Sequence, residues 1–316
     1  MTLELLFMAD FWQDLLQKQI PFPDKLVLQD PQCFIPLANM GIISVTGDDA
    51  ESFLQNLLTN DVSDLSVNQA QRSGFCTAKG RLFALFILIR RDNGYQIMLP
   101  KNMVKLLQQR LSMYILRSKV SIRDESENMY CLATVTQNAI KSDNLQLIDY
   151  PNDNTRSIAI CDKENIENVI SQFEQQGLAL APQGYWEQLD IEQGLVMIWP
   201  ETKELFTPQQ INLDLVGGVS FSKGCYPGQE IVARLHYLGK PSRRLFIATA
   251  NDNQSADLAE EIFTEDNKVA GHIVSYQYNG QLLTLLLSLK LEASSAALFL
   301  KNGTPLKVSA SNGESS

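Results

Sequence analysis

Lys223–Glu230, with the sequence KGCYPGQE, is the stretch on which the prediction of this fold depends. It holds two glycines, a proline, a thiol and two opposite charges, and no hydrophobic period runs through it. Its flanks are apolar: Val219–Phe221 predicts a short strand, and Ile231–Ala233 predicts a second buried run. The stretch is either a pair of glycine turns with Cys225 as a small buried filler, or a functional loop that rigid elements hold in place.

The surroundings of Cys225 are positive in an acidic chain. The formal net charge of the 316 residues is -10, whereas the segment from Ser220 to Arg244 holds five cations and one anion, Glu230. A positive field favours the thiolate, which is the reactive and metal-binding form of cysteine. The acidic total makes non-specific binding to phosphate backbones unfavourable, so we expect no direct nucleic-acid partner.

The composition predicts a globular protein of about two or three domains, since 45% of the residues are hydrophobic and 20% are charged. The five cysteines are widely spaced without a C-x-x-C pair, which indicates reduced thiols, a cytoplasmic location and no metal site. Two histidines are too few to suggest a zinc hydrolase. The first residues lack a cationic leader and no apolar run reaches about 18 residues, so we expect neither a signal peptide nor a membrane span.

The order of the predicted elements indicates the α+β class. Leu3–Gln19 has the spacing of an amphipathic helix that docks on the body of the protein. Hairpin turns are predicted at Lys79–Arg81 and at Asn93–Gly94. A β-α-β-like unit follows in the middle of the chain, and after Arg244 the pattern changes to strands and turns, which predict a small antiparallel barrel or sandwich.

Residues 217–234, which include KGCYPGQE, resemble the K-G-C-[YF]-x-G-Q-E signature of the YgfZ-type folate-binding proteins. These are relatives of the glycine-cleavage T-protein, an aminomethyltransferase, and they serve iron–sulfur cluster assembly or repair. Four other segments extend the resemblance over roughly residues 33 to 300: residues 41–64, Phe75–Arg81 with Thr77 in place of an Asp, Ile191–Gly194, and Pro208–Leu215.

The resemblance implies a T-protein-like multidomain fold with a ferredoxin-like insertion and a small C-terminal β-barrel. The expected parts are an N-terminal helix and linker (1–32), a folate-binding α+β domain (33–120 with 185–240), a ferredoxin-like unit (121–184), a β-barrel (241–309) and a tail (310–316).

The resemblance also implies a tetrahydrofolate site. Trp186 corresponds to a tryptophan linked to folate, Met40 replaces a second tryptophan, and Glu192 stands where a carboxylate holds the amide edge of the pterin. Without the resemblance, Trp186 is equally a core aromatic and Glu192 a solvated helix residue. The signature adds Cys225 as the functional thiol, and further cofactor-binding residues that shape its loop: Lys223, Tyr226, Gln229, Glu230 and Arg234.

The function that the resemblance implies is that of a folate-binding accessory protein for iron–sulfur cluster assembly or repair, and through it for tRNA methylthiolation. Its expected partners are iron–sulfur assembly proteins or client enzymes. T-proteins carry carboxylates soon after the glycine of the hairpin, where this chain has Phe83 and Ala84, which cannot transfer a proton. Aminomethyl transfer is therefore disfavoured. The alternatives are a folate-dependent one-carbon transferase or demethylase, and an interaction module in which folate binding is vestigial.

Overall fold

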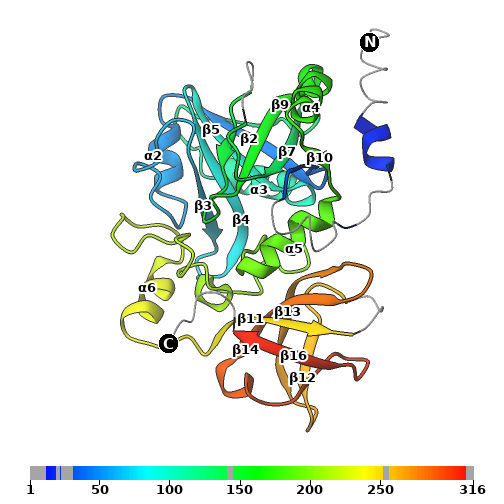
Figure 1. Cartoon of the computed structure of the whole chain (residues 1–316). Helices are drawn as coiled ribbons and strands as arrows, with labels where there is room; N and C mark the ends of the chain where they lie inside the picture. Colours follow the sequence, from blue (N-terminus) through cyan, green and yellow to red (C-terminus); the bar gives the residue numbers. More distant parts are fainter. Residues whose placement is uncertain (1–11, 19–21, 23–30, 141–144, 252–255, 311–316) are drawn as a thin grey trace. The chain divides into compact units, whose positions relative to one another are not determined.

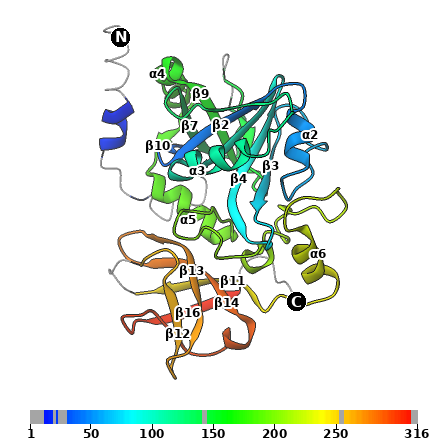
Figure 2. The ribbon, with the colours of Figure 1, turned by 180° about the vertical axis from the view of Figure 1, so that it is seen from behind.

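The computed structural model describes residues 12–18, 22, 31–140, 145–251 and 256–310. Two compact units divide the chain. The first consists of Met1–Ala50, Leu65–Gln71 and Ile87–Tyr185, and the second of Glu51–Asp64, Arg72–Phe86 and Trp186–Ser316. Helices and sheets are mixed along the chain, which confirms the predicted α+β class (Figures 1 and 2).

The first unit contains a five-stranded sheet with the strand order β10-β1-β7-β9-β8. Its strands are β1 (Cys33–Pro36), β7 (Met129–Val135), β8 (Ile148–Asp149), β9 (Arg156–Asp162) and β10 (Ala179–Leu180). The short helix η1 (Lys163–Asn165) and the helix α4 (Ile166–Gln175) follow β9, and the chain then turns at Gly177, where φ is +84°. This is the β-α-β arrangement predicted for the middle of the chain.

The N-terminal helix docks on this sheet. Residues 12–17 are helical, and Trp12 stacks on Tyr130 with ring centroids 4.2 Å apart. Trp12 and Leu15 are buried in one cluster with Phe173 of α4. The docking predicted for this helix is confirmed for these residues, and the rest of the predicted segment Leu3–Gln19 lies outside the described residues.

A second five-stranded sheet has the order β3-β4-β5-β2-β6. Its strands are β2 (Met40–Thr46), β3 (Ala70–Cys76), β4 (Leu82–Arg91), β5 (Gly94–Pro100) and β6 (Ser121–Asp124), and the helices α2 (Ala50–Gln55) and α3 (Lys101–Ser112) follow β2 and β5. Both predicted hairpin turns are confirmed, because Gly80 and Gly94 have φ values of +68° and +142°. Glycine adopts such angles without the steric cost that a side chain adds.

The C-terminal part is a closed antiparallel barrel in the order β11-β14-β13-β12-β15-β16. Its elements are β11 (Arg243–Ala250), β12 (Glu261–Thr264), β13 (Val269–Tyr278), β14 (Leu283–Lys290), η3 (Leu291–Ala293), β15 (Leu298–Phe299) and β16 (Pro305–Ala310). Closure removes the exposed edges that an open sheet would leave. The predicted barrel is confirmed, and the sequence had indicated its first four strands and the Asn302–Gly303 turn but not β15 or β16.

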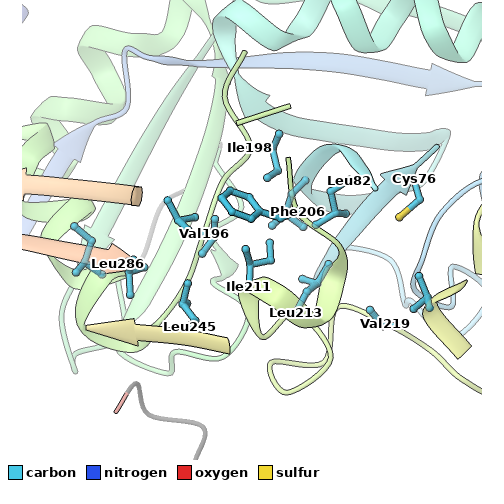
Figure 3. Close-up of a cluster of buried hydrophobic side chains, with 14 residues drawn as sticks. Cys76, Leu82, Val196, Ile198, Phe206, Ile211, Leu213, Val219, Leu245 and Leu286 are labelled. Carbon is cyan, nitrogen blue, oxygen red and sulfur yellow. The ribbon is translucent and has the colours of Figure 1, made fainter. Parts of the chain in front are cut away.

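After β10 and before β11, the chain forms α5 (Gln183–Gln193), η2 (Pro208–Ile211) and α6 (Gln229–Tyr237). Irregular segments join these helices, and they contribute to a core of the second unit (Figure 3). Its members come from the connecting segments, the β3–β4 hairpin and the barrel, and Figure 3 labels Cys76, Leu82, Val196, Ile198, Phe206, Ile211, Leu213, Val219, Leu245 and Leu286.

The strand predicted at Val219–Phe221 is wrong, and the burial predicted for Ile231–Ala233 is confirmed for Val232 but not for Ile231. Val219–Phe221 is irregular, because the amide of Ser220 bonds to the carbonyl of Thr59 (2.9 Å) instead of joining a strand ladder. Ile231–Ala233 is part of α6, and Ile231 is 38% exposed. A short apolar run fits a helix as well as a strand, so periodicity did not separate the two.

No helix in the described ranges has both the length and the apolar character that crossing a membrane requires.

Candidate functional site

The segment Ser220–Gly228, which we call the thiol loop, is anchored at one end by a buried lysine. The ammonium nitrogen of Lys223 donates hydrogen bonds to the carbonyl oxygens of Gln55 (2.5 Å), Leu58 (2.7 Å) and Asn60 (3.0 Å). The last carbonyls of a helix lack partners within the helix, and here one side chain satisfies three carbonyls at and beyond the end of α2. Lys223 therefore fastens the thiol loop to the end of α2.

The residues around Thr59 strengthen this attachment. The Thr59 hydroxyl donates to the carbonyl of Gly218 (2.7 Å) and accepts from the amide of Gly74 (2.8 Å). The Asn60 amide donates to the carbonyl of Gly217 (2.8 Å). The chain thus enters the thiol loop through hydrogen bonds that involve both α2 and β3.

The other end of the thiol loop packs against the turn of the β3–β4 hairpin. Gly228 precedes α6 with φ +82°, and a Cβ atom on it would lie 2.3 Å from the carbonyl oxygen of Thr77 and 2.8 Å from the Cα of Gly80. A Cβ atom on Gly80 would lie 2.9 Å from the Cβ of Ile231. Two segments that resemble the family, Phe75–Arg81 and KGCYPGQE, are therefore in direct contact, and glycine is needed on both sides.

Cys225 is exposed, whereas the other four cysteines, Cys33, Cys76, Cys131 and Cys161, are buried. Burial raises the pKa of each of these four thiols to about 12. A buried thiol with so high a pKa is chemically inert at neutral pH. The structure thus excludes Cys225 as a buried filler and leaves it as the accessible thiol of the chain.

Tyr226, next to Cys225, points into the protein. Its side chain is buried, and the Lys223 nitrogen lies 5.5 Å from the centre of its ring. Burial, with a smaller contribution from Cys76, raises the pKa of Tyr226 above its usual value, so the phenol stays neutral. Lys223 and Tyr226 together form the buried base of the loop, with Cys225 exposed between them in the sequence.

The positive charge predicted around Cys225 is partly neutralised. Lys223 is engaged by carbonyl oxygens, and Arg244 forms a two-pronged ion pair with Asp214 (2.7 and 3.1 Å). Arg234 and Lys240 remain exposed, and so does the acidic Glu230. Gln229 begins α6 and is half-buried. Its backbone N–H donates a hydrogen bond to the carbonyl oxygen of Tyr226 (3.1 Å).

The run Pro208–Leu215 connects α6 to the barrel. The Gln209 side chain donates to the carbonyl of Val232 in α6 (2.7 Å). The Asn212 side-chain oxygen accepts from the amide of Leu245 in β11 (3.3 Å). Arg244 donates to the carbonyl of Gln209 (3.0 Å) as well as to Asp214. The polar residues of this run are therefore structural links between α6 and β11.

Helix α5 carries two of the predicted folate residues on different faces. Trp186 is buried, with 2% of its surface exposed, and Glu192 is exposed. The Glu192 carboxylate accepts a hydrogen bond from the side-chain nitrogen of Gln188 (2.8 Å). The side-chain oxygen of Gln188 is buried and has no hydrogen-bond partner. The sequence prediction missed Gln188, although its spacing of four residues from Glu192 placed the two side chains together.

Met40 belongs to the first compact unit and begins β2, where it pairs with Pro100 of β5. The structure therefore brings Lys223, Cys225, Tyr226, Gln229, Glu230 and Arg234 together on one segment with the hairpin turn. Trp186 and Glu192 lie on a separate helix, and Met40 lies in the other unit.

The residues after the hairpin turn carry no proton-transferring group. Phe83 and Ala84 are buried in β4. The Phe83 ring packs edge-on against Phe75, with centroids 6.0 Å apart, and lies 5.3 Å from the Lys203 nitrogen. Among the described residues, moreover, no group of three His, Cys, Asp or Glu side chains is placed to hold a metal ion.

Comparison of the fold with solved structures defines the class of protein. The chain resembles the glycine cleavage system aminomethyltransferase T from Bartonella henselae, with a TM-score of 0.69 and 13% identity over 98% of this chain and 96% of that one. The fold is thus that of the T-proteins, as the sequence predicted.

No protein-family model matches the chain. The curated protein described as "tRNA-modifying protein YgfZ" from Photobacterium profundum is 30% identical over 269 residues, which are 80% of this chain and 82% of the relative. The protein of the same description from Colwellia psychrerythraea is 29% identical over 281 residues, which are 82% of this chain and 84% of the relative. The chain belongs to the YgfZ family of tRNA-modifying proteins.

Proposed function

We propose that this chain is a tetrahydrofolate-binding accessory protein that supports iron–sulfur cluster assembly or repair, and through it tRNA modification. The observation that carries the proposal is the exposed thiol of Cys225, held at the surface by a loop with both ends fixed, in a chain whose other thiols are buried. The relatives' description as tRNA-modifying proteins supports the downstream process. The T-protein fold supports a folate ligand.

The acceptors on α5 suit the donor edge of a pterin. A pterin presents an amide N–H and an amino group, and these need acceptors on the protein. The Glu192 carboxylate and the buried side-chain oxygen of Gln188 provide them on adjacent turns of one helix. A buried acceptor without a partner is costly to a fold, and a ligand donor would relieve that cost. Trp186, buried on the same helix, would support this surface from within.

The chemistry proposed for Cys225 follows from the exposure of its thiol and from the anchoring of the loop that carries it. A single cysteine cannot hold an iron–sulfur cluster by itself. Cys225 would therefore supply one thiolate ligand to a cluster, with the remaining ligands coming from a second molecule. The anchors at Lys223 and Gly228 keep the sulfur accessible while the loop stays fixed.

Replacement of the thiol in cells tests the role of Cys225. In a bacterial strain that lacks its YgfZ-family gene, we expect Cys225→Ser to fail to restore methylthiolated tRNA nucleosides, measured by mass spectrometry. Ser222→Ala, an exposed change three positions away, should restore them. Full restoration by Cys225→Ser would remove the thiol from the proposal.

Calorimetric titration with tetrahydrofolate tests the ligand. Gln188→Leu should weaken binding by about tenfold or more, because a buried hydrogen bond is lost, which corresponds to about 1.4 kcal/mol. The thermal stability of Gln188→Leu should change little. The variant loses the hydrogen bond from Gln188 to Glu192, but it also loses the cost of the buried, unpartnered side-chain oxygen of Gln188. Unchanged affinity in Gln188→Leu would contradict the α5 site.

A folate-dependent one-carbon transferase is the alternative that the sequence left open. The buried Phe83 and Ala84 give no support to it, since neither side chain can move a proton. Turnover of a methylated amine by the purified chain with tetrahydrofolate would revive this alternative.

A further inference from the structure

Helix α6 exposes its apolar stripe to solvent. Ile231, Leu235 and Leu238 are spaced as i, i+4 and i+7, so they lie along one face. Ile231 and Leu238 are 38% and 84% exposed and Leu235 is half-buried, whereas Val232 is the residue that the helix buries. An ordinary surface helix turns such a stripe toward the core. The stripe of α6 is therefore not explained by the folding of the described residues.

An aromatic cluster extends this apolar surface toward the thiol loop. The rings of Phe221 and His236 stack with centroids 3.7 Å apart and an interplanar angle of 13°. Tyr237 is 65% exposed and meets both rings edge-on, at 6.2 Å from Phe221 and 4.7 Å from His236. Apolar and aromatic side chains that gather at a surface are typical of the centre of a protein–protein interface.

Exposed cations surround this surface. Arg234 lies on the α6 face between Ile231 and Leu238, and Lys240 follows the helix. Gly80 lies against Ile231, so the hairpin turn borders this surface, and its Lys79 and Arg81 are exposed. Opposing them are Glu230 on α6 and Glu204, whose amide bonds to the carbonyl of Leu82 beside the turn. Lys223 and Arg244 are engaged by partners inside the protein. The exposed Lys79 and Arg81 of the hairpin turn therefore supply positive charge at this surface in their place.

We propose that the α6 face, consisting of Ile231, Arg234, Tyr237 and Leu238 with Lys79 and Lys240 at its rim, is the docking surface for an acidic, apolar-bearing segment of a partner protein. The cationic rim matches an acidic partner, and the apolar stripe matches its hydrophobic side chains. Nucleic acid is the less suitable occupant, because the chain as a whole carries -10 charges and repels a phosphate backbone. Phe221, which stacks on His236 of α6, belongs to the thiol loop, so a partner docked here would contact the loop that carries Cys225. The inference rests on the proposed function only in taking Cys225 as the working thiol.

Thiol–disulfide exchange measures such docking directly. The probe is a short peptide with aspartates, two leucines and one cysteine, the cysteine being activated as its mixed disulfide with thionitrobenzoate. The Cys225 thiol releases its proton to solvent, and the thiolate attacks the peptide sulfur. A disulfide between peptide and protein forms, and the thionitrobenzoate thiolate leaves and is followed by its absorbance. The four buried thiols do not compete.

The acidic peptide should react about tenfold faster than a matched peptide with lysines in place of aspartates at about 0.02 M salt, and the ratio should approach one at about 0.5 M salt. The triple variant Lys79→Gln, Arg234→Gln, Lys240→Gln should reduce the preference to about twofold or less. Leu238→Ser should slow the acidic peptide several-fold at high salt, where the apolar contacts dominate. The matched control, Lys105→Gln with Lys301→Gln and Lys307→Gln, also removes three exposed cations, from α3 and the barrel, and should change nothing.

Equal rates for the two peptides, or an equal loss in the control variant, would overturn the docking surface. So would protection of Cys225 by an equimolar amount of unmodified tRNA, because that result assigns the surface to nucleic acid. The exchange assay needs neither folate nor a cluster. A failure of the proposed function, seen as full activity of Cys225→Ser in cells, therefore remains distinguishable from a failure of docking.

Discussion

The barrel and α6 use their apolar residues in opposite ways. In β14 of the barrel, Leu283, Leu285, Leu287 and Leu289 are all fully buried. In α6, only Val232 is buried, and the apolar stripe of Ile231 and Leu238 is exposed. Burial of apolar surface is the main source of stability. The apolar residues of β14 are therefore explained by the stability that their burial gives. The exposed apolar residues of α6 are explained by the proposed docking of a partner protein.

The largest effect should come from the core of the barrel. Leu285→Ala removes a fully buried side chain and should lower the free energy of unfolding by about 3 kcal/mol, since a cavity remains. Chemical denaturation measures this value. A loss below about 1 kcal/mol would show that the barrel contributes as little to stability as α6 does.

The next effect should come from the junction of the thiol loop with the hairpin. Gly228→Ala places a Cβ atom 2.3 Å from the Thr77 carbonyl oxygen at a positive φ, so we expect a loss of about 2 kcal/mol in the free energy of unfolding. Gly224→Ala, in the same loop, is the matched control, because no atom lies within 4 Å of its added Cβ. Similar losses in the two variants would disprove the tight contact.

A smaller effect, dependent on pH, should come from Lys223. Burial lowers the pKa of Lys223 from its ordinary 10.5 to about 8, and Asp61 opposes this shift. Between these two pH values the unfolded chain keeps a proton that the folded chain has released, so the contribution of Lys223 to stability rises with pH.

Compared with Lys223→Met, the wild type should therefore gain on the order of 1 kcal/mol between about pH 7 and about pH 9.5. Urea denaturation of both proteins at the two pH values gives the difference, in which all other titrating groups cancel. A constant difference would mean that the three carbonyl oxygens hold the ammonium form over the whole range.

The smallest effect should come from the α6 stripe. Leu238 is 84% exposed, so Leu238→Ser should change the free energy of unfolding by less than about 0.5 kcal/mol. Thermal denaturation next to Leu285→Ala makes the contrast visible in one experiment. A loss as large as that of Leu285→Ala would show that Leu238 is part of a core, and would remove it from the docking surface.

The sequence predicted the barrel because its strands alternate and its turns carry Asn-Gly pairs. It missed β15, since two residues are too few to show a period. The role of Lys223 had no local signal, because its three acceptors lie between 163 and 168 positions away in the chain. The same is true of Arg244, whose charge the sequence assigned to the thiol loop and the structure pairs with Asp214.

The exposure of Cys225 and the direction of the α6 stripe also required the structure. A polar, glycine-rich stretch is compatible with a buried turn as well as with an exposed loop, and an i, i+4, i+7 stripe ordinarily indicates the core. The family signature indicated that the stretch is functional. It did not show that the side chains of Lys223 and Tyr226 are buried at the base of the loop while the Cys225 side chain is exposed.

The link from Arg244 to Asp214 has a consequence for inherited truncations. Arg244 and Leu245 lie in β11, the first strand of the barrel, and both bond to the run that also holds α6 through Gln209. A premature stop codon before β11 would leave KGCYPGQE intact in the gene product. It would nevertheless remove the partners of Asp214 and Asn212 and a share of the core beneath the signature. Presence of the signature in a shortened open reading frame is therefore poor grounds for inferring a working copy.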